Sequence, residues 1–118
     1  MERICFQLQV DPARIDEYVD AHRRVRAEML EAIAASGRRN YSLFLRPDGL
    51  LVGYYETDDD AASRAALAAD PRTARWEAAM AGFFLGLDGR PDQAALPLTE
   101  IFHLEDQLTA AAQPRTEK

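Results

Sequence analysis

Hydrophobic and polar residues alternate over the first ten positions, a pattern that predicts a half-buried β-strand. The polar side of this strand holds Cys5, Gln7 and Gln9, and the hydrophobic side holds Ile4, Phe6, Leu8 and Val10. We expect the hydrophobic side to pack under helices. The other side is too polar for a second core, so we expect it to line a pocket.

A long amphipathic helix is predicted next. Asp11 and Pro12 form an N-cap followed by proline at the first helical position. Hydrophobic residues then recur at three- and four-residue steps to about Ser36, and Gly37 is placed to end the helix. The predicted stripe consists of Ile15, Tyr18, Val19, His22, Val25, Met29 and Ile33.

A β-hairpin follows this helix. Alternation returns between Asn40 and Arg46, where Tyr41, Leu43 and Leu45 share one face. Residues 47–49 read Pro-Asp-Gly, which is a turn signal, and residues 50–56 supply the returning strand.

The second half of the chain predicts two helices and a last strand. Residues 58–60 are three aspartates that can cap an alanine-rich helix reaching about Ala69. Asp70 and Pro71 start another helix, whose apolar stripe is Trp76, Ala79, Met80 and Phe83. A polar loop to Leu96, a strand over 98–104 and a frayed or extended tail over 105–118 complete the expected order.

This order of elements is the split βαβ arrangement, ferredoxin-like βαββαβ. We therefore expect an α+β fold in which one antiparallel sheet carries helices on one face only. Residues 1–104 form the expected domain and residues 105–118 its C-terminal tail. An uncovered sheet face invites pairing with a second copy, so we expect a homodimer of the dimeric α/β-barrel type.

Composition narrows the function classes. A chain of 118 residues suits one domain, and its net charge of −6 argues against nucleic acid or an anionic membrane as the main partner. No apolar run approaches the length of about 20 residues that spans a bilayer, and the N-terminus has no signal-peptide shape. A single cysteine excludes an internal disulfide, which fits a reducing cytoplasm.

His22 is the leading candidate for chemistry. Tyr18 and His22 lie four residues apart, so on a helix they share one face. Imidazole can move protons near neutral pH, although a lone histidine on an apolar stripe is more often structural. His22, His103 and Cys5 are too few and too scattered for a zinc site, and no phosphate-binding loop or serine-nucleophile motif is present.

Arginines and aromatic residues add further candidates. Arginine is dense along and after the first helix, where interleaved acids favour a solvated face. Arg26 is the best functional candidate among them, because it lies four residues after His22. Core packing is the default explanation for Tyr41 and Trp76, but aromatic faces of this kind also line sugar pockets.

An ordered set of segments resembles L-rhamnose mutarotase. The N-terminal strand with Asp11-Pro12, then Tyr18, His22 and Glu28-Met29-Leu30, opens the match. It continues through residues 39–45, 51–56, 74–76 with Met80, and 100–104, so that it covers about residues 1–104. The resemblance implies a cytoplasmic, cofactor-free homodimer that interconverts the α and β anomers of L-rhamnose or a related 6-deoxy sugar. It places His22 at the general acid position and Tyr18, Tyr41 and Trp76 against the sugar.

Two positions depart from the family pattern. Arg26-Ala27-Glu28 stands where Trp-Pro-Glu is usual, and Glu77 stands where some members have a second tryptophan. If Arg26 faces the pocket, the ligand is more polar than L-rhamnose. The alternative function keeps the fold: a binding module or cofactor-free oxygenase or cyclase acting on an aromatic or acidic metabolite.

Overall fold

One antiparallel sheet forms the centre of the protein. The computed structural model describes residues 1–87 and 89–112. The sheet order is β2-β3-β1-β4, with every neighbouring pair antiparallel. This confirms the predicted ferredoxin-like sheet. The strands are β1 (Glu2–Gln9), β2 (Arg39–Leu45), β3 (Leu50–Thr57) and β4 (Leu96–Leu98).

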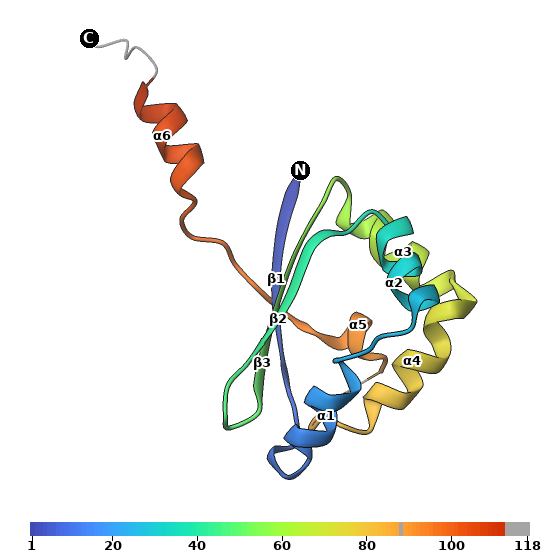
Figure 1. Cartoon of the computed structure of the whole chain (residues 1–118). Helices are drawn as coiled ribbons and strands as arrows, with labels where there is room; N and C mark the ends of the chain where they lie inside the picture. Colours follow the sequence, from blue (N-terminus) through green and yellow to red (C-terminus); the bar gives the residue numbers. More distant parts are fainter. Residues whose placement is uncertain (88, 113–118) are drawn as a thin grey trace.

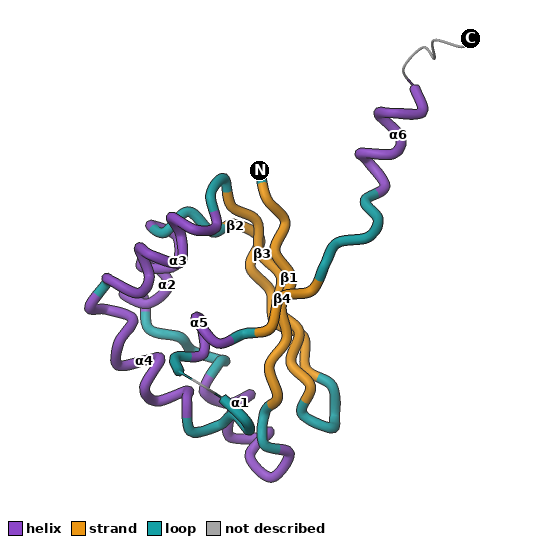
Figure 2. Tube along the Cα trace, turned by 180° about the vertical axis from the view of Figure 1, so that it is seen from behind, coloured by secondary structure: helices purple, strands orange, loops and turns teal. Residues whose placement is uncertain are grey.

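Helices cover one face of this sheet, while the last helix stands apart (Figures 1 and 2). The predicted cap residues begin two of them: Asp59 accepts a hydrogen bond from the Ala62 amide at 3.0 Å, and Asp70 accepts one from the Arg72 amide at 2.9 Å. The helices are the 3-10 turn η1 (Pro12–Arg14), α1 (Ile15–Ala21), α2 (Ala27–Ala35), α3 (Asp60–Ala69), α4 (Pro71–Ala81), α5 (Pro91–Ala94) and α6 (Leu104–Ala112).

The prediction of one continuous helix to Ser36 is wrong. His22 caps the C-terminus of α1, and Arg26 has the extended backbone angles φ −59° and ψ 143° at the N-cap of α2. Sheet size explains the break. A 25-residue helix would be roughly 37 Å long, whereas an eight-residue strand such as β1 spans only about 26 Å. Breaking the helix lets both pieces lie over the sheet.

The hydrophobic core lies between the sheet and the helices at one end of the fold. Its buried members are Val10, Tyr18, Leu51, Met80 and Phe83. Towards the other end, Ile4, Phe6 and Leu8 face a cavity on this same side. Of the polar side of β1 that was predicted to line a pocket, Cys5 lines this cavity but Gln7 and Gln9 do not, because the cavity opens between sheet and helices.

Gly53 makes room for an aromatic ring at the sheet surface. It pairs with Phe6 across β1 and β3, and a Cβ on Gly53 would lie 2.2 Å from the Phe6 ring. The ring instead packs near Tyr41 and Tyr55, with centroid distances of 6.3 and 6.2 Å. Glycine at this position thus sets the floor of the cavity.

The chain leaves the sheet earlier than predicted. A strand over 98–104 is wrong: β4 ends at Leu98, and Leu104 begins α6. Pro97 lacks an amide donor and sits on the edge strand, where proline is tolerated. The predicted frayed tail is helical over its first part, standing away from the body (Figure 1). Residues 113–118 of that tail lie outside the described residues.

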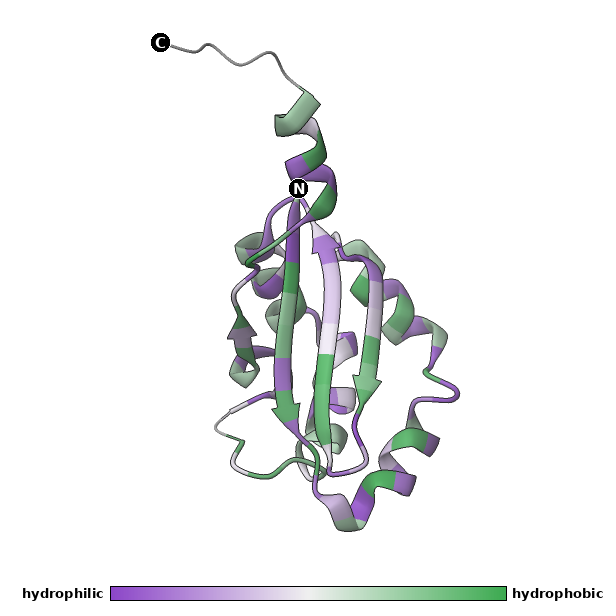
Figure 3. Cartoon of the chain, turned by 90° about the vertical axis from the view of Figure 1, so that its left-hand side faces the viewer, coloured by the Kyte–Doolittle hydropathy of each residue, from purple (hydrophilic) through white to green (hydrophobic). Residues whose placement is uncertain are grey.

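No helix of residues 1–87 and 89–112 covers the second face of the sheet. Figure 3 views this face and shows hydrophobic and hydrophilic residues mixed along the strands. Phe44 is 63% exposed, and Leu96 and Leu98 are 60% and 42% exposed. No helix in the described part of the chain is long and apolar enough to cross a membrane.

Candidate active site

A cavity of about 440 Å³ lies between the helices and the sheet. This volume is in the range of small-molecule sites. Tyr18, His22, Tyr41 and Trp76 all line it, so four of the five predicted site residues converge on one space although they come from three different parts of the chain. The cavity is the natural place for a ligand the size of a sugar.

Arg26 does not line this cavity. Its side chain is 68% exposed and pairs with Glu28 at 3.4 Å. It lines a second, neighbouring pocket together with Arg24, Arg72 and Arg75. The two pockets share Met29 and Trp76 in their linings. Its selection rested on one helix carrying His22 and Arg26 on the same face, and the break at residues 22–26 removes that relation.

The His22 ring is fixed by three contacts. Its Nδ1 lies 2.9 Å from the carbonyl oxygen of Tyr18. Because a carbonyl only accepts, Nδ1 carries the proton, which leaves Nε2 for a ligand. The ring centroid is 4.4 Å from that of Tyr18 and 5.1 Å from that of Trp76, which meets it edge-on. The break after α1 therefore presents a histidine of defined tautomer to the cavity.

Tyr18 is the most enclosed of the predicted residues. It is 5% exposed and packs edge-on against Phe83 and Phe84 at 5.6 and 5.5 Å. Burial raises the pKa of its phenol well above the ordinary value, and Tyr41 and Glu77 add to the effect. Tyr18 thus stays protonated and can donate a hydrogen bond at any physiological pH.

Tyr41 belongs to an aromatic group on the sheet. Its ring lies 5.2 Å from that of Tyr55 and 6.3 Å from that of Phe6. Burial raises the pKa of Tyr41 to about 12, although the Arg38 charge opposes this. These neutral phenols offer hydroxyl groups above an apolar floor, the combination that suits a pyranose ring.

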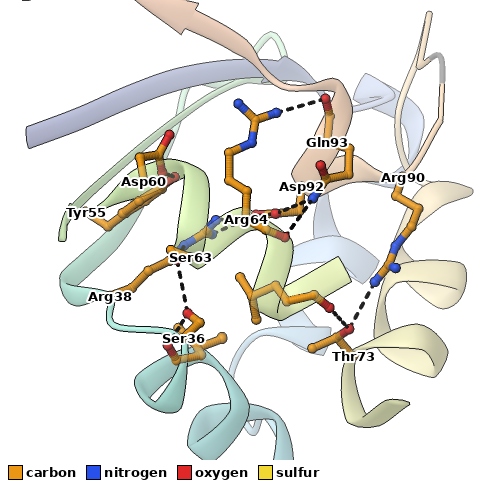
Figure 4. Close-up of polar contacts among 12 residues, drawn as sticks. Ser36, Arg38, Tyr55, Asp60, Ser63, Arg64, Thr73, Arg90, Asp92 and Gln93 are labelled. Atoms are coloured by element: carbon orange, nitrogen blue, oxygen red, sulfur yellow. Dashed lines mark hydrogen bonds and ion pairs between the residues drawn. The ribbon is translucent and has the colours of Figure 1, made fainter. Parts of the chain in front are cut away.

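A buried ion pair, drawn in Figure 4, forms part of the cavity lining. The Arg38 side chain is 1% exposed and binds Asp92 of α5 through both terminal nitrogens, at 2.6 and 3.3 Å. Its Nε donates to Ser63 of α3 at 2.9 Å, and its guanidinium stacks over Tyr55 at 4.0 Å. Burial alone would lower the pKa of Arg38. The hydrogen bond and charge of Asp92 outweigh this effect and raise the pKa above its ordinary value, so the guanidinium is charged.

Two more arginines hold the same segment. Arg64 of α3 donates to the carbonyl of Gln93 at 3.2 Å, and Arg90 donates to Thr73 of α4 at 3.0 Å (Figure 4). Together with Arg38, they fasten α5 to the preceding helices. This matters for the site because Pro91, Asp92 and Ala95 form part of the cavity wall.

Sequence reasoning missed Arg38, Asp92 and Glu77 as site residues. Arg38 was one arginine in a dense run, and its neighbour Arg39 is exposed. Nothing in the local pattern separates them. Glu77 had a signal, since it lies one turn before the buried Met80 and one turn after the buried Thr73. The predicted stripe on α4 included Ala79, which is exposed, in place of Glu77.

No metal site is apparent in the described ranges. Across residues 1–87 and 89–112, no group of three His, Cys, Asp or Glu side chains could hold a metal ion. The polar groups of the residues that line the cavity are phenols, one imidazole, one indole N–H, one thiol, carboxyls and guanidinium groups. Such groups bind hydroxyls and exchange protons.

Comparison with known proteins decides the family. The family model for L-rhamnose mutarotase matches residues 3–104. The chain belongs to the L-rhamnose mutarotase family. An L-rhamnose mutarotase of Opitutus terrae is 35% identical, over 89% of this chain and all of that protein. One from Jannaschia sp. is 32% identical, over 88% of this chain and 99% of its own length. The chain is thus related to isomerases that act on carbohydrates.

Solved structures agree on the fold of this mutarotase-family chain. The crystal structure of an L-rhamnose mutarotase from Formosa agariphila superposes with a TM-score of 0.70 at 22% identity, covering 87% of this chain and 98% of that one. Tetracenomycin F2 cyclase from Streptomyces glaucescens superposes with a TM-score of 0.59 at 20% identity, covering 87% and 95%. At these identities the likeness shows a shared fold.

Proposed function

We propose that the protein interconverts the α and β anomers of L-rhamnose or a related 6-deoxy sugar. The observation that carries this proposal is the placement of His22. Its Nε2 is the free nitrogen of a ring held by Tyr18 and Trp76, inside a cavity of sugar size that also contains Tyr41. Membership in the L-rhamnose mutarotase family supports anomer exchange as the reaction. The residues in the cavity have side chains that can transfer protons and bind sugar hydroxyls.

Anomer exchange needs only proton transfers. An acid protonates the ring oxygen while a base removes the proton of the anomeric hydroxyl, and the C1–O5 bond breaks. The aldehyde turns about C1–C2 and closes on its other face. We assign the acid to His22, which acts with both ring nitrogens protonated: Nδ1 donates to the Tyr18 carbonyl, and Nε2 carries the proton given to the ring oxygen. A positioned acid or base typically contributes about 10²–10⁴-fold. Tyr18 and Tyr41 hold sugar hydroxyls, and the Trp76 indole packs against the apolar side of the ring.

An exchange assay on a panel of sugars tests this function. Saturation transfer between the two anomeric proton signals measures the rate directly, with L-rhamnose, L-mannose, L-lyxose, L-fucose and D-glucose as substrates. We expect acceleration with L-rhamnose or a close relative. Uncatalysed rates with every sugar, together with binding of an aromatic acid, would favour the alternative of a binding module or cyclase.

We also propose that two copies pair through the open faces of their sheets. The exposed side chains of Phe44, Leu96 and Leu98 support this, because exposed apolar groups on one face favour association. Sedimentation velocity should give a dimer, and Phe44→Glu should shift it to a monomer. A monomeric wild-type protein at micromolar concentration would contradict the proposal. Cell fractionation tests the accompanying proposal of a cytoplasmic enzyme.

A further inference from the structure

Glu77 places a carboxyl group in the wall of the cavity. The inward face of α4 consists of Thr73, Glu77 and Met80, and Glu77 is only 8% exposed. Glutamate is almost never buried without a partner or a task. It lines the same cavity as His22, and the preceding residue, Trp76, contacts the His22 ring.

The two guanidinium groups that influence Glu77 are bound to other residues. Arg38 binds Asp92 and Ser63, while Arg90 donates to the Ala68 carbonyl and to Thr73. Burial raises the pKa of the Glu77 carboxyl, as does the charge of Asp92. Arg90, the Asp92 amide and Arg38 oppose this only in part. The group therefore gives up its proton less readily than an exposed glutamate.

Glu77 also acts electrostatically on the phenols that the resemblance assigns to the sugar. Its charge contributes to the raised pKa of both Tyr18 and Tyr41. Tyr18 lines the cavity from α1, Tyr41 from β2 and Glu77 from α4. A ligand in this cavity would share its lining with the carboxyl and both tyrosines.

The proposed reaction requires a base as well as an acid, and His22 supplies only one of the two. We propose that Glu77 is the base that takes the proton from the anomeric hydroxyl while His22 protonates the ring oxygen. This assignment rests on the proposed function. The O1–H electrons form the C1=O1 bond, and the C1–O5 electrons move to O5, which receives the His22 proton. Closure on the other face reverses each transfer and restores both residues.

The other acids around the cavity are bound to neighbouring side chains. Asp92 is bound by Arg38, and Asp60 accepts a hydrogen bond from the Tyr55 hydroxyl. From α2 the cavity receives only apolar side chains of residues 29, 30, 33 and 34. The titratable and charged groups that face this space from the other elements are Arg3, Cys5, Tyr18, His22, Arg38, Tyr41, Tyr55, Asp60, Arg64 and Asp92. Arg90 does not line the cavity, but its charge acts on Glu77.

The test is the pH profile of exchange for Glu77→Gln. A base must be deprotonated, so wild-type kcat should rise with pH through the raised pKa of Glu77. In Glu77→Gln we expect kcat to fall by about 10²–10³-fold with KM little changed. The rise with pH should also disappear. Glu28→Gln, an exposed glutamate on α2, is the matched control and should keep the wild-type profile.

A second readout needs no substrate. In protein labelled with ¹³C at glutamate carboxyls, one signal should titrate above the ordinary glutamate range and be missing from Glu77→Gln. Wild-type kcat and an unchanged profile in Glu77→Gln would overturn the assignment, as would a change confined to KM. A wild-type protein that exchanges no sugar overturns the proposed function, and the assignment fails with it. An active wild type with an equally active variant overturns the assignment alone.

Discussion

Arg38→Met should destabilise the fold far more than removal of a surface arginine. The substitution keeps the length of the side chain but leaves the Asp92 carboxylate, whose side chain is 12% exposed, without its partner. It also removes the hydrogen bond to Ser63 and the stacking on Tyr55. Breaking a buried pair in this way costs about 3–5 kcal/mol in the free energy of unfolding.

The neighbouring arginine provides the matched control. Arg39 pairs with Asp58 at 3.1 Å, but their side chains are 50% and 81% exposed. Water screens such a pair, so Arg39→Met should cost about 0–1 kcal/mol. The double variant Arg38→Met/Asp92→Leu should recover much of the loss, because it removes both charges at once.

Urea unfolding followed by fluorescence measures these differences. Trp76 is the one tryptophan of the chain, and it lies in the cavity wall. With a typical slope of about 1–3 kcal/mol per molar, a loss of 3 kcal/mol moves the midpoint by roughly 1–3 M. Equal losses for Arg38→Met and Arg39→Met would refute the reasoning. A double variant as unstable as the sum of its single variants would also refute it.

Three further predictions follow from the geometry. Arg26→Ala should leave kcat and KM of exchange nearly unchanged, since this side chain is 68% exposed outside the cavity; a large rise in KM would contradict its placement. Gly53→Ala should cost about 1–3 kcal/mol in urea unfolding, because its Cβ would lie 2.2 Å from the Phe6 ring. Glu77 has a raised pKa in the folded state, so the folded protein binds its proton more tightly and stability falls as pH rises through that pKa. Glu77→Gln should remove this fall, and an unchanged dependence of the urea midpoint on pH would contradict it.

The sequence predicted the sheet well because its signals are local. Alternation marks β1, β2 and β3, and Pro47, Asp48 and Gly49 mark the hairpin. The same holds for the caps at Asp59 and Asp70, whose side chains bond to amides within three residues. Each of these features depends on a few neighbouring residues, so no tertiary information was needed.

The errors occur where tertiary packing decides. The stripe from Ile15 to Ile33 is continuous in sequence, but the helix breaks after Ala21, because one unbroken helix would be longer than the strands that it covers. That break removes Arg26 from the face of His22. Residues 98–104 are hydrophobic enough for a strand, yet β4 ends at Leu98, where the chain turns away from β1.

The site was predicted only in part, because some of its residues are brought there by tertiary packing. Tyr18, His22, Tyr41 and Trp76 came from the ordered resemblance, and the structure brings them together at one cavity. The Arg38–Asp92 pair joins residues 54 positions apart, which no local pattern can indicate. Inward and outward arginines look alike in a sequence, and only the packing of α3 and α5 around Arg38 separates them.

The two histidines of the chain allow the most direct test of the central claim. His22 lines the cavity, whereas His103 lies just before α6 beside Glu105 and Asp106. Anomer exchange of L-rhamnose should be measured by saturation transfer for wild type, His22→Ala and His103→Ala, with circular dichroism as the check of folding. We predict a loss of about 10²–10⁴-fold for His22→Ala and near wild-type exchange for His103→Ala. A folded His22→Ala protein that exchanges anomers at the wild-type rate would contradict the account.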